Sequence, residues 1–105
     1  MAREDPLDVM AVIVSSFLNF RCTLKFLQVL FQNFGFDSLD YMDTIQHLED
    51  LQWGEESEGR LSLSPFGQAQ AFVTRMRRPD LCEQTEAMIK RIQSFLMEGM
   101  PDWNY

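Results

Sequence analysis

Apolar residues recur at helical spacing along most of this chain, in segments separated by capping residues, glycines and prolines. The first segment runs from Pro6 to about Phe20, with Asp5 placed to cap it and Asp8 near the positive end of its dipole. Its apolar positions fall nearly all round the helix: Leu7, Val9, Met10, Val12, Ile13, Val14, Phe17 and Leu18. This pattern predicts a central or interface helix.

Two more helices follow, joined by a short turn. Thr23 can cap the second helix, and Gly35 stands where a left-handed residue is favoured at its end. Asp37 opens a third helix two residues later. The expected apolar sides are Leu24, Leu27, Leu30, Phe31 and Phe34 on the second helix, and Leu39, Met42, Ile45, Leu48 and Leu51 on the third. Helices connected so closely through a glycine are typical of a helix-turn-helix pair.

The pattern changes to strand periodicity after Trp53. Residues 54–59 form a polar segment bounded by glycines, which predicts a turn. Residues 60–64 then alternate between polar and apolar, as a half-buried strand does. Residues 52–54 are expected to pair with this strand as the other arm of a β-hairpin.

Two helices complete the pattern. Ser64 and Pro65 begin the fourth, whose inward side is expected to be Phe66, Ala69, Phe72, Val73 and Met76. Pro79 ends it, and Asp80 starts the fifth. The fifth helix carries a seam suited to packing against another helix: Leu81, Thr85, Met88, Ile92 and Phe95, flanked by Ile89 and Leu96. The sequence thus predicts a main domain over 5–78, a C-terminal helix over 80–98 and an irregular tail over 99–105.

The predicted fold class is mainly α with a small β-hairpin. This order of elements, with the runs LEDLQW at 48–53 and GRLSLSPFG at 59–67, resembles the winged helix-turn-helix family of small bacterial, archaeal and phage regulators. The resemblance covers roughly residues 7–78, and the added C-terminal helix resembles the dimerisation helix of several such regulators. It implies a third helix, over 38–53, that enters the DNA major groove, and a wing that touches phosphate.

The charge of the chain argues against that mode of DNA binding. It holds 9 Lys and Arg against 16 Asp and Glu, a net charge of −7, and residues 37–58 include eight carboxylates and no Lys or Arg. Helical spacing places Asp40, Asp43, His47 and Asp50 on one outward face, and the wing adds Glu55, Glu56 and Glu58. These charges would repel phosphates. The face is a solvated surface, a binding surface for a basic partner, or a surface that itself imitates nucleic acid.

No catalytic, metal or cofactor motif is present, so we expect neither an enzyme nor a bound cofactor. His47 is the single histidine, and no nucleophile stands beside it in a recognisable pattern. Cys22 and Cys82 have no close spacing and are expected to be reduced thiols in a cytoplasmic protein. The apolar stretch from Leu7 to Phe20 is short of the roughly 20 residues that span a bilayer.

The leading hypothesis is therefore a homodimeric regulatory protein that binds another protein through its acidic face. The expected dimer interface is formed by the first and fifth helices: Val9, Ile13, Phe17, Leu81, Met88, Ile89, Ile92, Phe95 and Leu96. The alternative is a transcriptional regulator that contacts DNA through basic residues outside the acidic helix: Arg60, Arg75, Arg77 and Arg78. Cations at 75–78 also favour the C-terminal end of the fourth helix without any ligand.

Overall fold

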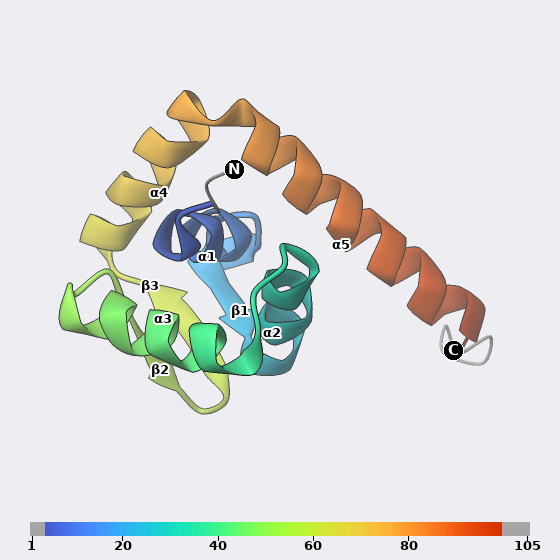
Figure 1. The fold of residues 1–105 in the computed structure, drawn as a ribbon, viewed down its shortest axis with the longest axis horizontal. Coiled ribbons are helices and arrows are strands. Elements are labelled where there is room, and N and C mark those ends of the chain that lie inside the picture. Colours follow the sequence, from blue (N-terminus) through green and yellow to red (C-terminus); the bar gives the residue numbers. More distant parts are fainter. Residues whose placement is uncertain (1–3, 100–105) are drawn as a thin grey trace.

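The computed structural model describes residues 4–99, with side chains as far as Phe95. Within this part of the chain, five α-helices and one short 3-10 helix accompany a three-stranded antiparallel sheet, which confirms the predicted fold class (Figure 1). The elements are α1 (Pro6–Ser15), η1 (Leu18–Phe20), β1 (Arg21–Thr23), α2 (Leu24–Asn33), α3 (Ser38–Asp50), β2 (Gly54–Ser57), β3 (Arg60–Leu63), α4 (Pro65–Arg77) and α5 (Pro79–Gly99). All of the predicted tail but Gly99 lies outside the described residues.

Helix α1 forms the centre of the core, as its all-round apolar pattern predicts. Seven of its ten residues are buried: Leu7, Val9, Met10, Ala11, Val12, Ile13 and Val14. It packs against α2, α3, α4, α5 and the sheet. The predicted end near Phe20 is wrong, because the helix stops at Ser15. The hydroxyls of Ser15 and Ser16 both donate to the Val12 carbonyl, and such side-chain hydrogen bonds compete with continuation of a helix.

The two helices predicted on either side of Gly35 are confirmed as α2 and α3. Gly35 has a φ of 95°, the left-handed conformation expected after α2. Asp37 caps α3, but the predicted inward side of α3 is partly wrong. The buried residues are Tyr41, Thr44, Ile45 and Leu48, whereas Leu39, Met42 and Leu51 are exposed. Tyr41 and Thr44 are buried because their hydroxyls are satisfied, donating to the carbonyls of Leu24 and Asp40 respectively.

The sheet has the strand order β1-β3-β2, with both pairs antiparallel. The hairpin is confirmed, but its turn is shorter than predicted. Residues 54–57 form the strand β2, so only Glu58 and Gly59 turn the chain. Gly59 has a φ of 75°, which suits a glycine in a tight turn. Strand β1 was not predicted, because three residues are too few to display an alternating pattern.

Helix α4 packs on α1 through small residues instead of the large ones predicted to face inward. Its buried residues are Gly67, Ala71 and Thr74. A Cβ atom at Gly67 would collide with the backbone carbonyl of Trp53, so this close approach requires glycine. The predicted inward residues Phe66, Ala69, Phe72, Val73 and Met76 are all exposed. The start of α4 is as predicted, with Pro65 in its first turn and the Ser64 hydroxyl accepting from the Gly67 N–H at 3.0 Å.

Helix α5 meets α4 at an angle near Arg78 and then continues past α2, away from the rest of the domain (Figure 1). The first part of its predicted seam lies against α1 and α2, where Leu81 and Thr85 are buried. Met88, Ile89 and Ile92 are partly buried against the same core. Phe95, further along, is 72% exposed. None of the described helices combines the length and apolar character needed to cross a membrane.

Candidate functional site

The outward side of α3 carries most of the predicted acidic face. Because the opposite side of α3 is buried in the core, Asp43, His47 and Asp50 are exposed to solvent. Gln46 lies between them and donates to the Asp50 carboxylate at 3.0 Å. Leu39, 67% exposed, lies on the same side of the helix. The predicted acidic face is therefore an outer surface, and it also includes an apolar side chain.

Asp40 has a different role from the other carboxylates of α3. Its backbone N–H donates to Asp37 Oδ1 at 2.8 Å, and its own Oδ2 accepts from the Asp37 N–H at 3.1 Å. This reciprocal capping box stabilises the start of α3. A substitution of Asp40 would therefore weaken the helix itself, so this residue is a poor probe of partner binding.

The three glutamates of the hairpin do not share one wing tip. The sheet register pairs Glu55 with Ser62, and Ser62 with Arg21, so these side chains lie on the outer face of the sheet. Glu56 pairs with the buried Leu61 and lies on the opposite face, at the edge strand. Only Glu58 belongs to the turn itself. This division follows from the strand β2, which the sequence pattern did not reveal.

Glu49 belongs to this site and was missed from the sequence. Its carboxylate accepts a hydrogen bond from the Glu56 N–H at 3.0 Å, which links α3 to the edge strand β2. The bond also satisfies a backbone donor that a sheet edge otherwise leaves open. We name Asp43, Glu49, Asp50 and Glu56 the acidic surface. The sequence pattern could not bring the α3 carboxylates together with Glu56, because it did not predict that residues 54–57 form a strand.

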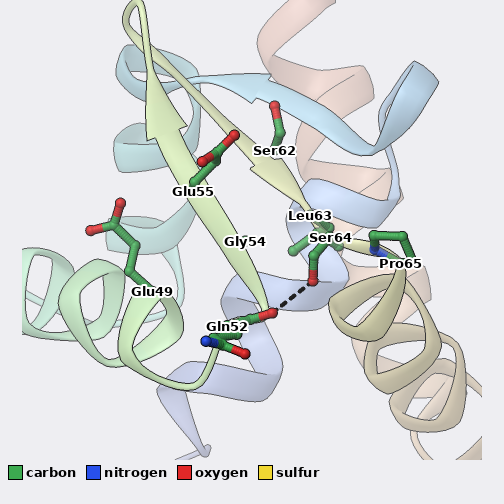
Figure 2. Close-up of a pocket in the computed structure, with 8 residues that line it drawn as sticks. All are labelled: Glu49, Gln52, Gly54, Glu55, Ser62, Leu63, Ser64 and Pro65. Carbon is green, nitrogen blue, oxygen red and sulfur yellow. Dashed lines mark hydrogen bonds between the residues drawn. The ribbon is translucent and has the colours of Figure 1, made fainter.

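Two hollows flank the edge strand, and Glu49 lines both. The smaller, about 240 Å³, has mainly apolar walls with Glu49 and Glu56 among its lining residues: Leu24, Tyr41, Met42, Ile45, Gln46, Glu49 and Glu56. The larger, about 540 Å³, lies between α3, the hairpin and the start of α4. Figure 2 shows Glu49 and Glu55 rising from α3 and β2 at this hollow, with the Ser64 hydroxyl bonded to the Gln52 carbonyl beside Pro65.

The arginines near the C-terminal end of α4 are paired with carboxylates of their own chain. Arg77 lies 3.1 Å from Asp8, and Arg78 lies 2.8 Å from Glu4 and 2.7 Å from Asp80. The hydrogen bond from Arg78 lowers the pKa of Asp80. These contacts tie α4 and α5 to the N-terminal segment. Two of the four arginines suggested for DNA contact are thus neutralised within the chain.

The other two arginines differ from each other. Arg75 donates to the hydroxyls of Ser15 and Ser16 and lies 3.9 Å from Glu86. Arg60 is exposed on β3 and takes part in none of the ion pairs among the described residues. Of the four arginines suggested for DNA contact, Arg60 is therefore the one that takes part in no ion pair within the described part of the chain.

The predicted dimer residues are divided between the core and the surface. Val9, Ile13 and Leu81 are at most 1% exposed within a single chain, so the structure places them beneath its surface and outside any accessible interface. The reason is that α4, α5 and the sheet already cover α1. Phe17, Met88, Ile89 and Ile92 are half-buried, Phe95 is exposed, and the side chain of Leu96 lies outside the described set.

Comparison of the chain with models of protein families, with curated proteins and with solved structures found no match. Among the described residues, no group of three or more His, Cys, Asp or Glu side chains is placed to hold a metal ion. The acidic surface and its two hollows are therefore the feature on which a function can be argued.

Proposed function

We propose that this protein is a winged-helix regulatory protein without enzymatic activity, which works as a homodimer and binds a basic segment of another protein at its acidic surface. The order of elements supports the winged-helix assignment: α1, the pair α2 and α3, the hairpin, and α4. The short strand β1 adds a third strand to the hairpin. The hairpin and the exposed side of α3 support the same assignment.

The observation that carries this proposal is the uneven distribution of ion pairs. Carboxylates around the α4–α5 corner are matched by arginines, as the pairs of Arg77 and Arg78 show. No ion pair in the described part of the chain involves Asp43, Asp50 or Glu56. Unmatched carboxylates on one surface create a negative potential that attracts a basic partner and repels phosphates.

The smaller hollow suggests how a basic side chain would bind. Its walls include Leu24, Met42 and Ile45, which suit the aliphatic stem of a lysine or arginine. Glu49 and Glu56 also line it and can accept hydrogen bonds from the charged head. The 66% exposure of Met42 supplies apolar contact area at this edge. Such a mixture of apolar and acidic groups suits a peptide better than a nucleic acid.

A titration with a fluorescent arginine- and lysine-rich peptide would test the proposal. The variants Asp43→Lys and Glu56→Lys should each weaken binding by about tenfold or more, equivalent to about 1.4 kcal/mol. Glu83→Lys, an exposed site on α5, changes the net charge equally and serves as the control. Equal weakening by all three variants would show that only net charge matters and would refute the proposed surface.

The same proteins would be titrated with duplex DNA at low salt to test the alternative. The proposal expects no saturable binding to duplex. Saturable binding that falls steeply with added salt, and that Arg60→Ala abolishes, would instead support a DNA-binding regulator. Affinity capture from cell extract, with and without nuclease, would then identify the natural partner.

A further inference from the structure

Helix α4 presents an apolar stripe to solvent on the side opposite to its contact with α1. The stripe consists of Ala69 and four large side chains that are more than half exposed: Phe66 at 55%, Phe72 at 63%, Val73 at 53% and Met76 at 71%. The remaining residues between 66 and 74 include no charged side chain. We refer to these five residues as the α4 stripe. Nothing in the described part of the chain covers it.

The size of the α4 stripe indicates a binding surface. Its four large side chains expose on the order of 450 Å² of apolar area, in the middle of the range of about 300–600 Å² for the largest patch on a typical monomer, a patch that is often functional. The helix has 13 residues, a length of about 20 Å. Contact along that length would approach the lower size limit of specific protein interfaces. A second helix of similar length is the occupant that fits such a stripe.

The spacing of the α4 stripe makes it complementary to itself. Phe66, Ala69, Val73 and Met76 follow at steps of three, four and three, a sequence that reads the same in both directions. A two-fold axis at the middle of two antiparallel helices would place Phe66 against Met76 of the second copy. The same axis would place the small Ala69 against Val73 of the second copy. Seams with this spacing are those by which helices pair.

We infer that the α4 stripe is the homodimer interface of this protein, formed by two antiparallel α4 helices related by a two-fold axis. The inference rests on the homodimer of the proposed function and replaces the interface predicted on α1 and α5. The distal part of α5, with the exposed Phe95, is the competing surface. Figure 1 shows α4 and the distal part of α5 on opposite sides of the domain, so variants on each helix test the two surfaces separately.

Analytical ultracentrifugation of the full chain over a range of concentrations tests this interface. The wild type should dimerise, and Val73→Glu should shift the dissociation constant by at least a hundredfold. Phe95→Glu is the matched control, because it adds the same charge to an exposed apolar site on α5. Circular dichroism should show that both variants remain folded, since both sites are more than half exposed.

A mixing experiment tests the antiparallel register directly. Phe66→Glu and Met76→Lys should each dimerise weakly alone, and their mixture should recover a heterodimer, because the introduced glutamate and the introduced lysine would then face each other. Any one of three results would overturn the inference. The wild type could prove monomeric, or Phe95→Glu could dissociate the dimer while Val73→Glu does not. The mixture could also have a dissociation constant no lower than those of the separate variants. The Val73→Glu monomer should still bind the basic peptide, so loss of the dimer and failure of the acidic surface are distinguishable.

Discussion

Thr85 offers the sharpest test of how the core is held together. This α5 residue is fully buried, and its hydroxyl has no hydrogen-bond partner among the residues that the structure describes. Burying an unpaired hydroxyl costs about 1–3 kcal/mol. Valine has nearly the same shape without the hydroxyl, so Thr85→Val should raise the free energy of unfolding by about 1 kcal/mol or more. For a chain of this length each 1 kcal/mol raises Tm by about 4–8 °C.

Thr74 provides the matched control, because it is buried in α4 but has partners. Its hydroxyl donates to the Gln70 carbonyl at 3.1 Å and lies 3.4 Å from Asp8 Oδ1. Thr74→Val removes these hydrogen bonds and should lower the free energy of unfolding by about 1 kcal/mol. Urea denaturation followed by circular dichroism measures both changes. The reasoning would be refuted if Thr85→Val were less stable than the wild type, or if both variants changed the free energy of unfolding in the same direction. Hydrogen bonding of the hydroxyl would then not determine the effect of substitution at these two positions.

Further predictions concern packing and pH. Gly67→Ala should lower the free energy of unfolding by about 3 kcal/mol or more in urea denaturation, because the new methyl collides with the Trp53 carbonyl. Burial raises the pKa of Cys22 to about 12 and that of Tyr41 to about 12. Because these groups therefore ionise in the unfolded chain before they ionise in the folded one, the free energy of unfolding should fall between about pH 9 and 12. A free energy of unfolding that stays constant over this pH range would contradict this expectation. Burial also raises the pKa of Asp8, so its contribution to stability is lost as pH rises past the unfolded value of 3.8. Asp8→Asn should therefore gain stability relative to wild type at about pH 7, and Tm measurements should show that gain shrinking toward about pH 4.

Local signals in the sequence predicted most of the elements of this fold. Asp5, Asp37 and Ser64 each cap a helix as their side-chain chemistry suggests. Gly35 and Gly59 adopt the left-handed conformations that a helix end and a hairpin turn require. These signals involve only a few neighbouring residues, so they do not depend on how the rest of the chain packs. The predicted end of α1 failed because two serines terminate the helix before its apolar pattern ends.

The faces of the helices were harder to predict than their limits. On α4 the large apolar residues suggested one side, yet the core is reached through Gly67 and Ala71, and at Gly67 the Trp53 backbone lies too close for a larger residue. On α3 the hydroxyls of Tyr41 and Thr44 find carbonyl acceptors, so these polar residues replace Leu39 and Met42 inside. Both choices depend on distances between elements far apart in the chain.

The central position of α1 has a consequence for synthesis of the protein. This helix leaves the ribosome before part of its covering, including Leu81 of α5, has been translated. At about 5–20 residues per second, the nascent chain carries an uncovered apolar helix for several seconds. Chaperone contact during translation should therefore concentrate on residues 7–14.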